Sequence, residues 1–318
     1  MRAALLLLFA PMICQAETAP AAPAKLAEIG SSEREDLYNE HGMNYAKGLY
    51  LGLDGSPEDE NRSKKSEALN HKIRERSIRK LENHLAKAKE PRIRQELLHR
   101  LSQMHEQQAE IITRRSDIKD KETPLKLALR NSIKYLMVLK NEFPKFAPDA
   151  TIFNLAENHA KLKEDQKAEF FYREVINRFP KSAVVADSLL SLGNLYFERQ
   201  AFLTARNFYQ KILGTEEMKL YPYAHYKMAW CYFNESDFPS AVARLEQSIY
   251  ESRKLTQGGD KKLGVEEEAL SDLVLFFAEY GSPSQAKEYF EKLVDREKAN
   301  ELRYNLARRL FEHGKHHV

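Results

Sequence analysis

The sequence predicts an all-α protein in which stacked helix pairs form a solenoid after a long helical hairpin. Three observations support this fold class. Hydrophobic residues make up 42% and charged residues 31% of the 318 residues, a balance that excludes general disorder. None of the 12 glycines lies between Gly55 and Gly193, where strand turns would need several. Small and large apolar residues also recur at a fixed spacing through the second half of the chain.

The overall charge argues against one class of partner. The chain has 50 Lys and Arg against 47 Asp and Glu, which leaves a formal net charge of +3. A dedicated nucleic-acid binder normally carries a clear basic excess. We therefore expect no nucleic-acid partner.

Residues 1–16 have the pattern of a cleaved signal peptide. Arg2 precedes an apolar run from Ala3 to Ile13, and small residues lie three and one positions before Glu17. The run is too short for a mature membrane anchor, so we predict an exported chain without a transmembrane span. Lipidation of Cys14 is the alternative, although Ile13 is bulky where that signal prefers a small residue. With cleavage after Ala16, Cys231 would be the only thiol left.

Residues 17–61 are predicted to be a tether followed by an irregular segment. The first part is rich in Ala and Pro, a composition that buries little and stays extended. The second part has Gly42, Gly48, Gly52 and Gly55, which interrupt any helical period.

Residues 62–147 are predicted to hold a basic helical hairpin and a divergent first repeat, with a second helix starting at Pro91. Between Arg62 and Arg94 the chain has twelve Lys or Arg and four Glu, a net charge of +8. Arg74, Arg76, Arg79 and Lys80 form the proposed basic patch. The run is interpreted either as a solvated face with helical ion pairs or as a contact for an anionic partner or surface.

Residues 148–318 contain the internal repeat. Four alanines open predicted helices, and each is followed four residues later by a large side chain. The alanines are Ala168, Ala205, Ala241 and Ala286, with spacings of 37, 36 and 45 residues, and the large residues are Tyr172, Tyr209, Leu245 and Phe290. Thirteen residues before each alanine lies an apolar residue of a first helix: Leu155, Leu192, Met228 or Leu273. The small residue allows close helix approach, and the large residue fills the remaining space.

This pattern resembles the tetratricopeptide repeat. Gly193, Tyr196, Ala205 and Tyr209 match the family pattern closely, whereas the first copy has His159 where an aromatic is usual. The resemblance implies a tetratricopeptide-repeat α-solenoid preceded by a long helical hairpin. The last copy, residues 302–314, has only a first helix and is expected to cap the solenoid.

A narrower resemblance covers roughly residues 92–290. The string from Tyr226 to Asn234 and the Phe-Pro ending at Pro180 resemble cell-envelope repeat proteins associated with adventurous gliding motility. Phe-Pro endings also occur in repeat proteins of outer-membrane assembly and cell division. The resemblance implies a scaffold in the periplasm or at the outer-membrane periphery.

The sequence offers no convincing catalytic or metal site. His313, His316 and His317 are close together but lack carboxylate or Cys ligands at suitable spacing. Cys231 has no paired His and lies in an aromatic repeat helix, which favours a buried, inert thiol. Phosphate-loop, nucleophile-elbow and zinc-protease motifs are lacking. We therefore predict a protein that is not an enzyme and needs no cofactor or metal.

The tetratricopeptide resemblance implies a concave partner-binding groove lined by first helices. In the third copy this register selects Tyr223, Tyr226, Trp230, Phe233 and Asn234, and aromatic residues are frequent binding hot spots. The other positions are Phe153, Glu157, Leu190, Asn194, Phe197, Leu275, Tyr304 and Arg308. The same aromatics, Trp230 included, could instead belong to the core between repeats.

Two functions follow from this pattern. The favoured hypothesis is an envelope scaffold that holds a peptide or helix of a partner protein in the aromatic groove, as part of a motility or outer-membrane complex. The basic hairpin would contact an acidic partner or another anionic envelope component. The alternative is a peptidoglycan- or carbohydrate-binding accessory of an envelope enzyme, with Trp230 stacking on sugar rings.

Overall fold

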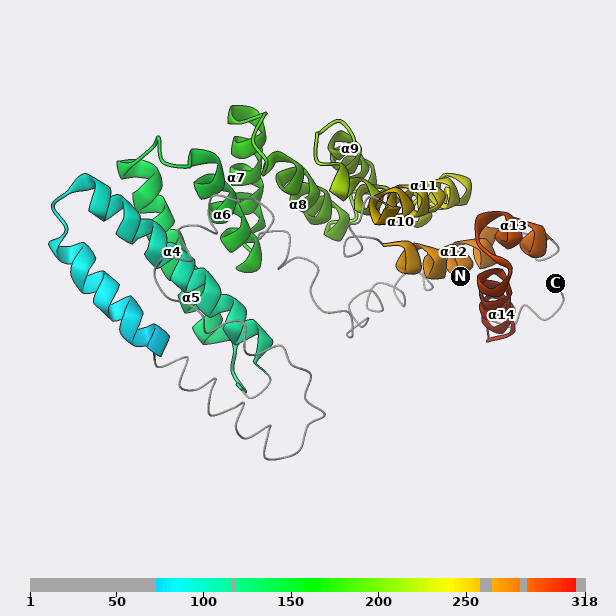
Figure 1. The fold of residues 1–318 in the computed structure, drawn as a ribbon, viewed down its shortest axis with the longest axis horizontal. Helices are drawn as coiled ribbons and strands as arrows, with labels where there is room; N and C mark the ends of the chain where they lie inside the picture. Colours follow the sequence, from blue (N-terminus) through cyan, green and yellow to red (C-terminus); the bar gives the residue numbers. More distant parts are fainter. Residues whose placement is uncertain (1–72, 116–117, 258–264, 281–284, 313–318) are drawn as a thin grey trace. The chain divides into compact units, whose positions relative to one another are not determined.

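A computed structural model describes residues 73–115, 118–257, 265–280 and 285–312, all within one compact unit, His71–Val318. In this part of the chain every regular element is a helix. From α4 to α12, each α-helix packs against the next one in sequence, and α14 packs against both α12 and α13 (Figure 1). The predicted signal peptide, tether and first residues of the basic hairpin lie outside the described residues, and the proposed domain boundaries stay a prediction.

The first described helices form a small packed group. The helix at residues 73–87 is followed by α4 (Pro91–Arg114), which begins where the fixed φ of proline suits a first helical position. α5 (Glu122–Glu142) packs along α4. A core of Ile78, Leu98, Leu101, Tyr135 and Leu139 joins the three helices.

The remaining helices form the pairs that the repeat predicts. α6 (Pro148–Lys161) pairs with α7 (Asp165–Arg178), and α8 (Val185–Glu198) pairs with α9 (Phe202–Ile212). After the short 3-10 helix η1 (Met218–Leu220), α10 (Tyr221–Asn234) pairs with α11 (Phe238–Gln257). α12 (Glu266–Tyr280) and α13 (Ala286–Leu293) complete the series before α14 (Arg296–Glu312).

The close helix crossings confirm the repeat pattern. All four repeat alanines and the four large residues that follow them are buried. At the tightest crossing, a Cβ added to Gly193 would lie 2.3 Å from Cε1 of Tyr209. Glycine is therefore required there for α9 to approach α8.

The turns inside three successive pairs share one backbone conformation. Lys163, Gln200 and Ser236 each have a positive φ, of 58°, 57° and 64°, between the first and the second helix of a pair. None of them is a glycine, so this left-handed turn has no obvious sequence signal.

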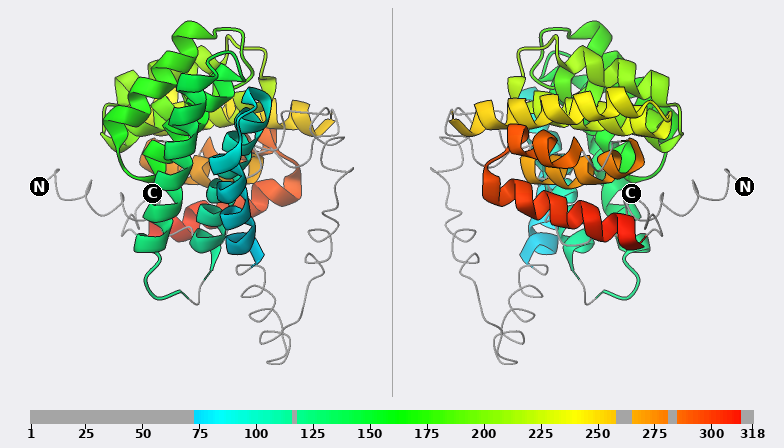
Figure 2. Two further views of the ribbon diagram at one scale, coloured as in Figure 1. Left: turned by 90° about the vertical axis from the view of Figure 1, so that its left-hand side faces the viewer. Right: turned by 90° about the vertical axis from the view of Figure 1, so that its right-hand side faces the viewer.

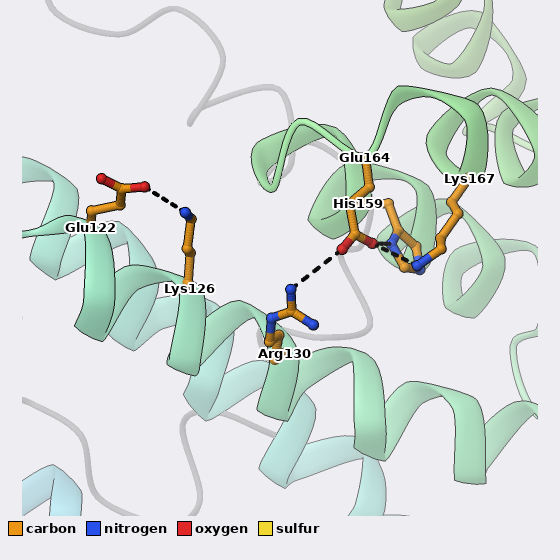
Figure 3. Close-up of polar contacts among 6 residues, drawn as sticks. All are labelled: Glu122, Lys126, Arg130, His159, Glu164 and Lys167. Carbon is orange, nitrogen blue, oxygen red and sulfur yellow. Dashed lines mark hydrogen bonds and ion pairs between the residues drawn. The ribbon is translucent and has the colours of Figure 1, made fainter.

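A charged contact fixes one of these turns to the preceding helix (Figure 3). Glu164 accepts hydrogen bonds from His159 Nδ1 at 2.7 Å and from Lys167 Nζ at 3.0 Å. Its other oxygen lies 3.6 Å from Nη2 of Arg130 on α5. The hydrogen bonds from Lys167 and then His159 lower the pKa of Glu164 and favour the charged carboxylate.

α14 closes the described part of the solenoid. It buries Ala299, Leu302 and Leu306 in the same core as the helices of the last pairs. α12 contacts α11 on one side and α14 on the other, as the right-hand view of Figure 2 shows with α14 in red. The outward side of α14 is mainly polar, although Tyr304 on it is 68% exposed.

Candidate functional site

The predicted groove residues of α10 form a continuous aromatic surface, which we define as Tyr223, Tyr226, Trp230 and Phe233. All four side chains are partly buried. The rings of Tyr223 and Tyr226 stack with their centres 6.2 Å apart. Trp230 meets Phe233 edge to face at 5.5 Å. Their spacing on one helix explains these contacts, because residues three and four apart share a face.

The aromatic surface is fixed to the next repeat by a partly buried carboxylate. Asp272 on α12 accepts hydrogen bonds at Oδ2 from the Tyr226 hydroxyl at 2.6 Å and from Trp230 Nε1 at 2.9 Å. Burial raises the pKa of Asp272, and the two hydrogen bonds oppose this shift. Phe276, also on α12, stacks on Phe233 at 4.2 Å and meets Trp230 edge to face at 5.1 Å.

Trp230 thus has features of both a core residue and a groove residue, the two interpretations that the sequence left open. Its ring packs against the core and its N–H has an internal partner, yet the side chain keeps part of its surface accessible. Asn234 supports it, with Nδ2 donating to the Trp230 carbonyl at 2.7 Å. Contacts within the protein therefore hold Trp230 in place without a partner.

The predicted groove residues of α6 and α8 are mostly engaged within the protein. Glu157 accepts hydrogen bonds from the hydroxyls of Tyr172 and Ser191, the latter at 3.1 Å. Asn194 Oδ1 accepts from the Tyr209 hydroxyl at 2.8 Å. Leu190 is only 7% exposed, so it contributes to packing and not to an open surface.

The aromatic residues of these two helices remain partly accessible. The Phe153 ring lies 6.1 Å from that of Tyr172. Phe197 meets Phe202 edge to face at 5.4 Å, and the ammonium group of Lys227 lies over its ring. They extend the apolar character of the first-helix side beyond α10.

Asp187 on α8 is an acidic residue that the sequence analysis did not select. Burial, with the charges of Glu157 and Glu217, raises the pKa of Asp187 on α8 to about 6. Lone acidic residues are frequent in the first turn of a helix, so its sequence position gave no specific signal.

The predicted groove residues further along the chain are more exposed to solvent. Leu275 on α12 is partly buried, whereas Tyr304 and Arg308 on α14 are exposed. Arg308 Nε lies 3.7 Å from Glu312 of the same helix. Neither α14 residue has a described contact with the aromatic surface.

The basic patch lies on the helix at residues 73–87. Arg76, Arg79 and Lys80 are exposed, and Arg79 forms a helical ion pair with Glu75 at 3.8 Å. Arg74 is partly buried, and this burial lowers its pKa. Exposed Lys87, Lys89 and Arg92 continue the positive charge toward α4. The ion pair covers one charge and leaves most of the basic surface free for a partner.

The sequence analysis also considered Cys231 and three C-terminal histidines as possible sites. Cys231 is fully buried, as predicted, and burial raises its pKa to about 12, which disfavours the reactive thiolate. His313, His316 and His317 lie outside the described residues. Within the described residues, no group of three or more His, Cys, Asp or Glu could hold a metal ion. None of the described helices is long and apolar enough to cross a membrane.

The fold and these surfaces define an all-α solenoid of helix pairs. Comparison with family models identifies tetratricopeptide repeats at residues 150–182 and 223–252, which correspond to the α6–α7 and α10–α11 pairs. The chain therefore contains tetratricopeptide repeats and folds as a tetratricopeptide-type α-solenoid, as the sequence predicts. No curated protein matches the chain.

Two solved structures are similar at low identity. One is BtubC from P. vanneervenii, with 14% identity, a TM-score of 0.37, and coverage of 58% of this chain and 90% of that one. The other is the APC/C hetero-tetramer Cut9–Hcn1, with 14% identity, a TM-score of 0.33, and coverage of 67% and 46%.

Proposed function

We propose that this protein is an exported scaffold of the bacterial cell envelope that binds a partner protein through the aromatic surface of α10. Tetratricopeptide repeats are interaction scaffolds, since their stacked helices present an extended surface. The partner is a peptide or helix whose apolar side chains pack on Tyr223, Tyr226, Trp230 and Phe233. No catalytic step is assigned to the protein.

One observation carries this proposal. Four neighbouring aromatic side chains remain partly accessible, although Asp272 and Phe276 hold three of them in place and the fourth, Tyr223, stacks on Tyr226. Burying a rigid aromatic surface costs little side-chain entropy, and such residues dominate the binding energy of protein interfaces. A surface held in place before binding is suited to a specific partner.

The envelope location is the finer part of the proposal. It is supported by the signal-peptide pattern of residues 1–16 and by the basic helix, which suits an anionic component of the envelope. A role in a motility or outer-membrane complex fits this location. A mature N-terminus at Glu17 in the envelope fraction would support export, whereas a diacylglyceryl group on Cys14 would require lipid anchoring.

Affinity capture from envelope extract tests the binding function. The bait is the wild-type protein, with Tyr223→Ser as the surface variant and Tyr250→Ser as the control. Tyr250 is 56% exposed, more than the partly buried Tyr223, and lies on the second helix α11. We expect Tyr223→Ser to weaken capture of one protein by roughly thirtyfold, the size of a hot-spot loss, and Tyr250→Ser to leave it unchanged. Equal capture by both variants, or capture of glycan strands alone, would contradict the proposal.

A further inference from the structure

Successive first helices contact one another through one equivalent position. Ser191, Lys227 and Asp272 each lie one residue before the buried apolar residue of their repeat, which is Leu192, Met228 or Leu273. Ser191 on α8 donates to Glu157 of α6, and Asp272 on α12 accepts from Tyr226 and Trp230 of α10. At two of the three junctions, this position therefore makes a hydrogen bond to the preceding repeat.

Lys227 occupies the middle junction and differs from the other two. Its Nζ lies 4.6 Å from the centre of the Phe197 ring on α8. Among the described residues, no carboxylate lies within ion-pair distance of this ammonium and no hydrogen bond reaches it. Glu198 acts on it at longer range, but that side chain is exposed and lies 3.9 Å from Lys163.

The surroundings of Lys227 disfavour its charged form. Lys227 is partly buried, and burial lowers its pKa, while the influence of Cys231 and Glu198 opposes this shift. A cation over an aromatic ring gains only about 0.5 to 2 kcal/mol, which does not replace a counter-ion. An anion placed beside Lys227 would oppose this shift and stabilise the charged ammonium.

Lys227 also adjoins the aromatic surface. It follows Tyr223 by four residues and precedes Trp230 by three, so all three lie close together on α10. An anion at Lys227 would therefore come with apolar neighbours packed on the rings.

We propose that Lys227 binds an aspartate or glutamate side chain of the partner protein, next to an apolar residue that packs on the aromatic surface. This inference rests on the proposed function, because it names the chemistry of the segment that the aromatic surface takes. Lys227 then determines which segments are accepted, and the rings supply the apolar contact.

Selection from a library of random linear peptides, displayed with no free C-terminus, tests this assignment. Three baits are compared: the wild type, Lys227→Gln and Lys211→Gln. Lys211 is a matched control, since its Nζ also lies over a ring, 5.4 Å from the centre of Phe208, but on the exposed side of α9. We expect the wild type and Lys211→Gln to enrich peptides with Asp or Glu at one fixed position beside an apolar residue. Lys227→Gln should lose that acidic preference and keep the apolar one.

Titration with one selected peptide, acetylated and amidated, gives the quantitative result. Replacing its Glu by Gln should weaken binding to the wild type by roughly tenfold and leave binding to Lys227→Gln unchanged. Lys227→Gln should melt no lower than the wild type because it removes an unpaired charge; if it fails to fold, Lys227→Met replaces it. Enriched peptides whose acidic preference is absent, or persists in Lys227→Gln, would overturn this inference and leave the binding function intact. If the wild type enriches no peptide at all, the proposed function and this inference both fail.

Discussion

At the residue scale, Asp272 explains how Trp230 can belong both to the core and to a surface. The carboxylate satisfies the indole N–H and the Tyr226 hydroxyl together, so the polar edges of both rings point into the protein. Only parts of the rings remain for a partner. A surface residue of this kind also supports stability.

Replacing Trp230 should therefore cost folding energy. We expect Trp230→Ala to lower the free energy of unfolding by about 2 to 4 kcal/mol, since it removes contacts with Phe233 and Phe276 and leaves Asp272 with one donor fewer. Trp230→Phe keeps a ring and should cost less than about 2 kcal/mol. Urea denaturation followed by circular dichroism measures both. An alanine variant as stable as the wild type would show that the ring contributes no packing.

Asp187 should make stability depend on pH. Its pKa is raised from 3.8 to about 6, so the folded state disfavours the charged form. This penalty is absent below pH 4, grows between pH 4 and 6, and is complete above pH 6. Asp187→Asn should thus be more stable than the wild type by about 1 to 2 kcal/mol at pH 8, after allowance for solvent screening, and equally stable at pH 4. Denaturation at the two pH values checks this; an equal difference at both would exclude the titration of Asp187 as its cause.

The sequence could predict the residues of the aromatic surface but not what holds them. Tyr223, Tyr226, Trp230 and Phe233 follow from the register of one helix, which a local pattern encodes. Asp272 lies 42 residues beyond Trp230, and its role depends on how two repeats dock. The same applies to Lys227 and Phe197, whose contact joins a side chain of α10 to one of α8.

At the element scale, the pairing of helices was predictable because it depends on small residues at fixed positions. Ala168, Ala205 and Ala241 mark crossings that the structure confirms. The turns were less predictable, since Lys163, Gln200 and Ser236 adopt a left-handed conformation without the glycine that would announce it.

The crossing of α8 and α9 gives a direct test of the repeat geometry. Gly193→Ala places a methyl group 2.3 Å from the buried Tyr209 ring, whose hydroxyl is also bonded to Asn194. Such overpacking should cost about 1 to 3 kcal/mol. Gly214→Ala is the control, because the nearest atom to its added Cβ is 3.5 Å away. Thermal melts of both variants suffice, and equal melting temperatures would contradict the close crossing.

The basic helix should act through charge alone. Reversing Arg76, Lys80 and Lys87 to Glu should abolish salt-sensitive association with the envelope fraction while leaving the fold intact, because all three side chains are exposed. Arg74 is left in place since it is partly buried. The control reverses three other exposed lysines, Lys145, Lys181 and Lys287, with the same change in net charge. Sedimentation with envelope fragments at low and high salt measures association. If the first variant still associates with the fragments, the basic helix is only a solvated face.

At the scale of the whole molecule, the repeats place two chemically different surfaces on one solenoid. A basic helix precedes the repeats, and an aromatic surface lies on the third pair. Such an arrangement suits a scaffold that contacts an anionic component with one element and a partner protein with another. The two contacts are separable, so the charge-reversal variant should still bind the partner.

The central claim is that the first helices of the repeats carry the protein-binding surface, and crosslinking in intact cells tests it most directly. A photoreactive phenylalanine analogue replaces Tyr223 on α10 in one strain and Tyr250 or Phe170 on second helices in the control strains. The two control side chains are more accessible than the partly buried Tyr223, with exposures of 56% for Tyr250 and 62% for Phe170. The account predicts a discrete crosslink to one protein from position 223 and none of that mass from positions 250 and 170. The same crosslink from all three positions, or crosslinks from 250 and 170 alone, would contradict it.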